Sequence, residues 1–228
     1  MGNLFPRSLF AITDEQAMWR VQTQDDPHAF ARLVERWQGP IRNLCARMTG
    51  DLHRGEDLAQ EAFARVFARR KDYRPAGKFS TYLWRIALNL CYDELRRVKR
   101  RDLVPFETDG EQAGGALKEV VADEPGPDCR MMEAERAELV RQALLKLPEN
   151  HRTVVVLRHY EGLKFREIAD VLAIPEGTVK SRMAEGLSQL GRWLKPRLDE
   201  EIPGRGLRPD EPRVDTNGCE WTRKRILI

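Results

Sequence analysis

One stretch decides the fold of the C-terminal half: FREIADVLAIPEGTVKSRMA, residues 165–184. A helix-turn-helix needs a small residue where its helices cross, an apolar residue after the turn and an apolar anchor in the second helix. Ala169, Ile174 and Val179 stand at these places. Polar side chains then begin the second helix: Thr178, Lys180, Ser181, Arg182 and Glu185. Hydroxyls and cations at a helix N-terminus suit phosphate and base-edge contacts in the major groove of duplex DNA.

The helical pattern continues on both sides of this motif and predicts a domain over residues 131–198. Upstream, Leu139, Ala143, Leu144 and Leu147 form a helical stripe that Pro148 ends. The segment 152–160 contains Thr153 to Val156, which favour a strand. We nevertheless predict a helix there, because its neighbours are helical and Gly162 is a suitable C-terminal stop.

A second helical domain is expected over residues 25–101, where three apolar stripes repeat at helical spacing. The first stripe is Phe30, Leu33, Val34, Trp37, Ile41, Leu44, Cys45 and Met48. The second is Leu58, Ala62 and Val66 with Ala59, Phe63 and Phe67 alongside, and the third is Leu83, Ile86, Ala87 and Leu90. Gly39-Pro40 interrupts the first stripe and is expected to kink or split that helix.

The remaining segments differ in composition from these two domains. Residues 102–130 are acidic and rich in Gly and Pro, without a period, which predicts a flexible linker. Residues 1–24 form an N-terminal arm, and residues 199–228 form a polar tail that is expected to be disordered. The predicted fold class is therefore all-α, with two small helical domains joined by a flexible acidic linker.

Composition excludes several classes of protein. Of the 228 residues, 41% are hydrophobic and 33% charged, and the net charge is only +3. No apolar run approaches the roughly 20 residues that span a membrane, and no signal peptide is visible, so we expect a cytoplasmic protein without a membrane partner. The four cysteines are far apart and no C-x-x-C or paired histidine occurs, so no metal or other cofactor is expected.

A basic and aromatic face is predicted on the third helix of the first domain. The residues Arg85, Asn89, Tyr92, Arg96 and Lys99 recur at helical spacing opposite the apolar stripe. The loop before this helix adds Tyr73, Arg74 and Lys78. Cations follow a phosphate backbone, an amide can read base edges, and aromatic rings stack on unpaired bases. A solvated basic face is the simpler alternative for this pattern taken alone.

An acidic helix start precedes these elements, at residues 56–63. Asp57 and Glu61 lie one turn apart on its exposed side. Paired carboxylates can act as acid and base, but no histidine, nucleophile or phosphate-binding glycine loop accompanies them. The pattern indicates a protein-docking face or a favourable helix-dipole charge, and we do not expect an enzyme.

Together these motifs resemble the extracytoplasmic-function (ECF) sigma factors of bacterial RNA polymerase. Residues 25–101 resemble sigma region 2 through GEDLAQEAFARVF and FSTYLWRIALNLCYDELRR. Residues 133–197 resemble region 4 through LLKLPENHRTVVVLRHYEGLKFREIADVL and IPEGTVKSR. The two blocks stand in the family's order with only the linker between them, and they cover about two-thirds of the chain.

The resemblance implies a role for each set of residues. The core polymerase would be bound by Asp57, Leu58, Gln60 and Glu61. The melted minus-ten element would be held by Tyr73, Arg74, Lys78, Arg85, Asn89, Tyr92, Arg96 and Lys99. The duplex minus-thirty-five element would be read by Thr178, Lys180, Ser181, Arg182 and Glu185. Family members are often held by an anti-sigma factor, so an anti-sigma partner is expected, although nothing in the sequence identifies one.

The chain departs from the family pattern in the second half of the helix-turn-helix. Glu185 stands where many members carry Arg, and Gly186 weakens a helix by about 1 kcal/mol relative to Ala. Two other classes of protein stay open on the sequence alone. The first is a helix-turn-helix regulator that acts without stoichiometric polymerase binding, and the second is an adaptor that binds only protein.

Overall fold

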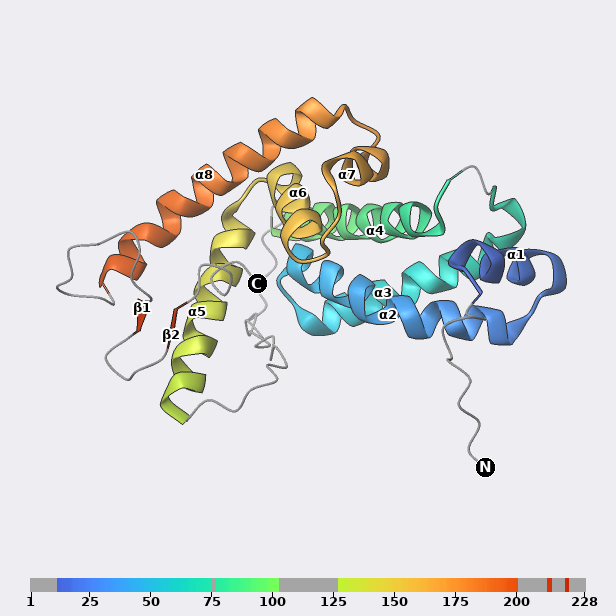
Figure 1. The fold of residues 1–228 in the computed structure, drawn as a ribbon, viewed down its shortest axis with the longest axis horizontal. Coiled ribbons are helices and arrows are strands. Elements are labelled where there is room, and N and C mark those ends of the chain that lie inside the picture. The colour runs from blue at the N-terminus through green and yellow to red at the C-terminus, as the bar shows by residue number, and fades with distance from the viewer. Residues whose placement is uncertain (1–11, 75–76, 103–126, 201–212, 215–219, 222–228) are drawn as a thin grey trace.

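The computed structural model describes residues 12–74, 77–102, 127–200, 213–214 and 220–221, and these are almost entirely helical (Figure 1). The helices are α1 (Asp14–Gln24), α2 (Pro27–Thr49), α3 (Leu52–Ala68), the 3-10 helix η1 (Arg70–Asp72), α4 (Phe79–Asp102), α5 (Pro127–Lys146), α6 (Glu149–His159), α7 (Phe165–Leu172) and α8 (Glu176–Glu200). The predicted all-α fold with two helical domains is confirmed.

The first domain consists of α1 to α4, packed around the stripes that the sequence predicts. Leu33, Ile41 and Leu44 of α2, with Val66 of α3 and Leu83 of α4, are all within 1% of complete burial. Helix α1 also contributes to this core through the buried side chains Ala17, Met18 and Val21. The domain therefore begins eleven residues before the boundary at residue 25, inside the segment that the sequence pattern leaves as an arm.

Short polar side chains fix where the helices of this domain begin. Thr13 and Gln16 form a capping box at α1. Asp26 accepts the backbone N–H groups of His28 and Ala29 at the start of α2. Asp51 accepts the N–H of Arg54 at the start of α3. Each cap satisfies amides that have no partner within the helix, so the boundaries follow from local chemistry.

Helices α2 and α3 form a hairpin whose turn and crossing both depend on glycine. Gly50 ends α2 with φ +83°, in the left-handed region that glycine enters without strain. One turn into α3, a Cβ added at Gly55 would lie 2.7 Å from the backbone nitrogen of Ala46. Only glycine lets the two backbones approach this closely, which explains the glycine at the start of the GEDLAQEAF segment.

Helix α2 continues through Pro40 as one element from Pro27 to Thr49, so the expected split at Gly39-Pro40 does not occur. Proline removes a single backbone hydrogen bond from the helix interior. The apolar residues on both sides of it, Leu33 before and Ile41 and Leu44 after, are buried in the same core. Their packing outweighs the lost hydrogen bond.

The second domain consists of α5 to α8. Residues 149–159 form the predicted helix despite their strand propensity, because Val154, Val155 and Val156 are all buried between neighbouring helices. Gly162 follows with φ +69°. The helix-turn-helix is formed by α7 and α8, and its turn passes through Ala173 in the left-handed region with φ +54°.

The ends of this domain differ in two respects from the sequence prediction. Helix α5 begins at Pro127 and not after residue 130, and α8 continues to Glu200. In the tail, the strands β1 (Arg213–Val214) and β2 (Glu220–Trp221) pair antiparallel, and the other residues after 200 lie outside the described part of the chain. Residues 103–126 of the predicted linker lie outside the described part of the chain.

The two domains pack directly against each other, and their buried side chains form one continuous apolar cluster. Figure 1 shows α6 and α7 lying against α4, and α5 reaching the end of α2. Arg152 of α6 is 6% exposed and donates to the carbonyl oxygens of Met48, at 2.5 Å, and of Leu145 and Leu147. Arg141 of α5 donates to the carbonyl of Gly50 at 2.8 Å. Two arginines of the second domain thus satisfy the C-terminal carbonyls of α2.

Candidate polymerase and nucleic-acid interfaces

The acidic surface of α3 is exposed. Asp57, Gln60 and Glu61 point away from the core, and the side chains of Asp57 and Glu61 are 64% and 50% exposed. Leu58, which the sequence groups with them, is only 5% exposed and packs in the core of the domain. The surface available to a protein partner therefore consists of the three polar residues, while Leu58 supports them from below.

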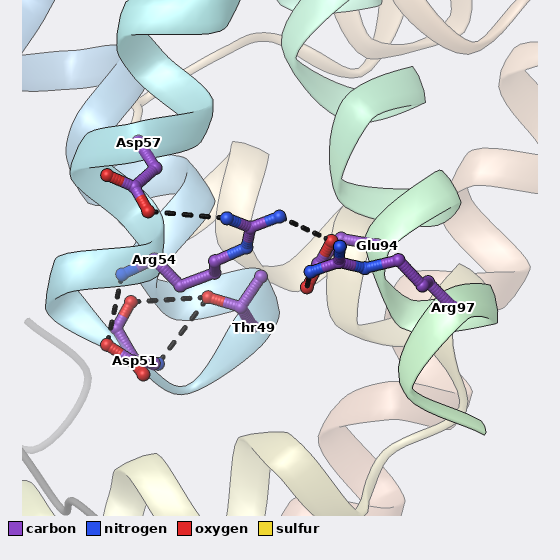
Figure 2. Close-up of polar contacts among 6 residues, drawn as sticks. All are labelled: Thr49, Asp51, Arg54, Asp57, Glu94 and Arg97. Carbon is purple, nitrogen blue, oxygen red and sulfur yellow. Dashed lines mark hydrogen bonds and ion pairs between the residues drawn. The ribbon is translucent and has the colours of Figure 1, made fainter. Parts of the chain in front are cut away.

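A network of charged residues ties this surface to α4 (Figure 2). Arg54 of α3 contacts Asp57 at 3.3 Å and Glu94 of α4 at 2.7 Å. Arg97 contacts the other oxygen of Glu94 at 2.9 Å. Burial acts to raise the pKa of Glu94, but the hydrogen bonds from the two arginines outweigh it and the pKa lies below its usual value. Glu94 is therefore a charged joint between two helices.

The sequence reading missed this joint, although the chain carries a signal for it. Ala87, Leu90, Cys91 and Glu94 lie at helical spacing on one stripe, and the first three are buried. A carboxylate on an apolar stripe needs a cationic partner, because burial of an unpaired charge is costly. The partner, Arg54, lies 40 residues away, so only the fold identifies it.

The basic face of α4 lies opposite the buried stripe, as predicted. Arg85, Asn89, Arg96 and Lys99 are exposed, and Tyr92 is half-buried. Arg96 contacts Asp93 of its own helix at 2.7 Å. Every other cation or hydroxyl named on this face contacts the second domain, and these contacts involve α6 and α7.

The contacts between α4 and the second domain are polar and run along the helix. Arg85 donates to the carbonyl oxygens of Asp170 and Val171, at the end of α7. The hydroxyl of Tyr92 lies 2.8 Å from that of Thr153, and the ammonium of Lys99 lies 2.5 Å from a carboxylate oxygen of Glu149. Side chains from the whole length of the basic face thus have partners in α6 and α7.

The loop before α4 contains one buried residue and two exposed cations among the residues predicted to bind DNA. Tyr73 is 6% exposed and packs against the rings of Phe79 and Tyr82, with centroid distances of 6.3 and 5.2 Å. Its ring is therefore covered in this structure, while Arg74 and Lys78 are exposed. Lys78 contacts Glu167 of α7 at 2.8 Å, and this hydrogen bond lowers the pKa of Glu167.

The start of α8 presents the residues that the helix-turn-helix pattern predicts. Lys180, Ser181 and Glu185 are exposed, Thr178 and Arg182 are partly exposed, and Val179 is fully buried beneath them. The polar contacts of Lys180 and Ser181 are local. Lys180 pairs with Glu176 at 2.7 Å, and the hydroxyl of Ser181 donates to the carbonyl of Thr178.

Glu185 and Gly186 have separate structural roles. Glu185 accepts from Gln189 at 2.9 Å and pairs with Arg192 at 3.4 Å. Gly186 is buried where α8 crosses α6, and an added Cβ would lie 3.0 Å from a methyl carbon of Val155. The glycine that weakens the helix in isolation therefore allows the two helices to cross closely.

Within the described ranges, no group of three or more His, Cys, Asp or Glu side chains is arranged to hold a metal ion. None of the helices in the described segments is both long and apolar enough to cross a membrane.

Comparison with known proteins identifies the family of both domains. Residues 33–101 match the sigma-70 region 2 family, and residues 137–190 match the sigma-70 region 4 family. The chain is 38% identical over 170 residues to the ECF RNA polymerase sigma factor SigW of Bacillus subtilis, which covers 75% of this chain and 91% of that protein. It is 32% identical over 191 residues to the ECF RNA polymerase sigma-E factor of Escherichia coli, covering 81% and 96%.

Two solved structures share the fold. CnrH in complex with the cytosolic domain of CnrY aligns with a TM-score of 0.57 at 23% identity, over 80% of this chain and 97% of that one. The sigma factor RpoE of Bartonella quintana, in complex with the anti-sigma factor NepR, aligns with a TM-score of 0.54 at 19% identity, over 73% and 96%. With two family matches in the expected order and relatives aligned over most of their length, the chain belongs to the ECF sigma factors and acts in transcription initiation, not as an enzyme.

Proposed function

We propose that this sigma factor divides promoter recognition and polymerase binding among three surfaces. Asp57, Gln60 and Glu61 of α3 dock on the core polymerase, supported by the buried Leu58. The α4 face, with the loop at Tyr73 to Lys78, binds the melted minus-ten element. The observation that carries the proposal is that the acidic and basic surfaces lie on adjacent helices and share the charged joint at Glu94.

The minus-ten assignment rests on the chemistry of the α4 face. Arg85, Arg96 and Lys99 supply cations for phosphates, and Asn89 is the exposed amide among them. An amide can read a base only where its hydrogen-bonding edge is unpaired or faces the major groove. Tyr92 supplies an aromatic ring for stacking. Tyr73 would need to leave its packing against Phe79 and Tyr82 before it could contact a base.

The minus-thirty-five assignment rests on the N-terminal turns of α8. Thr178, Lys180, Ser181 and Arg182 bind the duplex there, while Glu185 weakens the attraction to phosphate. The structure supports this view of Glu185, because its carboxylate also pairs with Arg192 and so neutralises a cation of the same helix.

The place of action and the regulatory partner follow from the function. Core polymerase and promoter DNA are in the bacterial cytoplasm, where we place this protein. An anti-sigma factor is a further expected partner, since one of the solved structures that share the fold is a complex with such a factor.

The polymerase-docking surface is tested by charge reversal. Asp57→Lys/Glu61→Lys should reduce the affinity for core polymerase at least tenfold while helical content is unchanged, since like charges across an interface repel. A matched control is Glu35→Lys/Glu135→Lys, which makes the same charge change at exposed sites on α2 and α5. Equal core affinity of the two variants in a fluorescence titration would refute the assignment.

The minus-ten surface is tested through Asn89, after transcription start sites have been mapped with the purified protein and core polymerase. Asn89→Ala should impair open-complex formation on duplex promoters. A promoter with a pre-melted bubble should restore part of the unwinding defect but not base selectivity. Normal run-off transcription by Asn89→Ala at every mapped promoter would contradict the assignment.

A further inference from the structure

Carboxylates and backbone carbonyls of the second domain contact cations of the α4 face and of the loop before it. Glu167 contacts Lys78 at 2.8 Å, and Glu149 contacts Lys99 at 2.5 Å. Between them, the guanidinium of Arg85 donates hydrogen bonds to the carbonyl oxygens of Asp170 and Val171. Three of the cations assigned to minus-ten DNA are therefore occupied by groups from α6 and α7.

The occupying groups share the chemistry of a phosphate backbone. Glu149 and Glu167 each present carboxylate oxygens to an ammonium group, as a phosphate does. The last carbonyls of α7 have no partner within the helix and stand at the negative end of its dipole, so they attract the guanidinium of Arg85. The contacts extend from Lys78 to Lys99, along almost the whole of α4.

We propose that the second domain, through Glu149, Glu167 and the C-terminal end of α7, occupies the minus-ten surface as an internal substitute for DNA phosphates. The inference rests on the proposed role of the α4 face in DNA binding. Single-stranded promoter DNA and the α6–α7 surface then compete for the same cations, and minus-ten DNA is captured only when the two domains separate.

The other two surfaces remain accessible while the minus-ten surface is covered. Asp57, Gln60 and Glu61 are exposed on α3, and Lys180 and Ser181 are exposed on α8. In this arrangement of the domains, the residues proposed to dock on polymerase and to bind duplex DNA are therefore exposed, while the proposed minus-ten surface is covered.

The ion pairs of this contact are weak enough to be displaced. The side chains of Lys78 and Lys99 are 65% and 68% exposed even in the closed arrangement. Solvent screens such pairs, and each contributes little to stability. A DNA strand that offers several phosphates in a row can replace these ion pairs, while separation of the domains also requires the shared apolar cluster and the Arg152–Met48 hydrogen bond to open.

The contact can be trapped chemically in the full-length protein. A carbodiimide joins a touching ammonium and carboxylate as an amide, with loss of water. Mass spectrometry of the digested product should identify Lys78–Glu167 and Lys99–Glu149 links, and a random-sequence single-stranded DNA oligonucleotide should reduce their yield. Absence of both links from the free protein, or the same yield at saturating oligonucleotide, would overturn the proposal.

Neutral variants test the competition directly. Glu149→Gln/Glu167→Gln should bind the same oligonucleotide about threefold to tenfold more tightly than the parent, as expected for two weakened surface ion pairs. Glu35→Gln/Glu135→Gln changes the net charge equally at exposed sites away from α4 and should give a smaller gain. Circular dichroism checks that both variants are folded. Equal gains in fluorescence anisotropy titrations would contradict the proposal.

A third pair of substitutions distinguishes a failure of internal substitution from a failure of DNA binding by the α4 face. Lys78→Ala/Lys99→Ala should lose affinity for the oligonucleotide in the Glu149→Gln/Glu167→Gln background. If the lysine variant loses affinity but the glutamine variant gains none, DNA binding by α4 stands and internal substitution fails. If the lysine variant loses nothing, the assignment of the α4 face to DNA fails.

Discussion

The two surfaces assigned to DNA differ in where their charged partners come from. At the α4 surface, Lys78 in the preceding loop pairs with a residue 89 positions away, and Lys99 of the helix pairs with one 50 positions away. On α8, Lys180 pairs with Glu176 one turn earlier, and Glu185 with Arg192 two turns later. Local pairs form whenever the helix forms, whereas long-range pairs exist only in one arrangement of the domains. The minus-thirty-five surface is therefore constant, and the minus-ten surface depends on how the domains are placed.

The long-range ion pairs at α4 depend on the packing of the two domains, and Arg152 is a buried contact between them. Its substitution is expected to have the largest effect on stability. Arg152→Met would leave the carbonyls of Met48, Leu145 and Leu147 without their donor. We expect the free energy of unfolding to fall by about 4 kcal/mol, since buried polar groups would lose charge-assisted hydrogen bonds. Chemical denaturation measures the loss. Arg166→Met, at an exposed site on α7, should change it by less than about 0.5 kcal/mol, and equal losses would show that Arg152 is not a structural contact.

A second test uses pH and Glu161, whose carboxylate lies 3.6 Å from Arg47 of α2 and is 8% exposed. Burial raises the pKa of Glu161 to about 7, against a smaller opposing effect of Arg47. The folded protein thus binds this proton more tightly than the unfolded chain, so the stability contributed by protonation is present at low pH and is lost as pH rises to about 7. The loss amounts to about 3 kcal/mol at most.

Glu161→Gln isolates this contribution. Urea unfolding of the parent and the variant at about pH 5 and pH 8 should show a smaller pH dependence in the variant. Glu135→Gln, at an exposed site, should keep the pH dependence of the parent. If Glu161→Gln also keeps it, Glu161 does not titrate in this range in the folded protein.

A smaller effect, on the affinity for minus-thirty-five DNA, is expected from Glu185 of α8. Glu185→Ala should tighten binding to all minus-thirty-five sequences about twofold to fivefold, since it removes a negative charge and releases Arg192. The ranking of sequences should not change in a library randomised in that element. Gln189→Ala removes the other partner without changing charge and serves as the control. A loss confined to one base position would show instead that Glu185 reads a base, such as the N4 amino group of cytosine.

The smallest effect concerns the crossing of α8 and α6 at Gly186. Gly186→Ala gains about 1 kcal/mol of helix propensity, but its methyl group would crowd Val155. In the parent we expect a net change in unfolding free energy within about 0.5 kcal/mol of zero. In a Val155→Ala background the same substitution should stabilise the protein by about 1 kcal/mol. Equal changes in both backgrounds would show that the close crossing does not matter.

The elements that sequence predicts well are those that local pattern determines. The apolar stripes of α2, α3 and α4 and the turn of the helix-turn-helix follow from spacing and from residues such as Val179 and Gly162. Even α6 was predicted correctly, although Val154 to Val156 favour a strand, because its flanking segments constrain it. The residues proposed for docking and DNA binding were predicted to lie on exposed faces for the same reason, and of these Leu58 and Tyr73 are buried instead.

The features that sequence could not predict depend on contacts between distant segments. The capping box at Thr13 is a local signal for the start of α1, but the burial of Met18 and Val21 depends on contacts with other helices. Pro40 is accommodated because the core on both sides holds α2 together. Glu149 and Glu167 are ordinary surface acids in the sequence, and only the packing of the domains brings them to Lys99 and Lys78. The role of Gly186 likewise depends on Val155, which belongs to another helix.

The charged joint at Glu94 has a consequence for how such a protein can diverge. The carboxylate of Glu94 lies on the inner side of α4 and holds Arg54 of α3, so this contact between the two helices lies on the side of α4 away from Asn89. On the proposed assignment of Asn89 to the minus-ten element, a substitution at this outward position changes promoter choice and leaves the contact between Glu94 and α3 in place. Promoter preference can then diverge on one side of α4 as long as Glu94 is kept on the other.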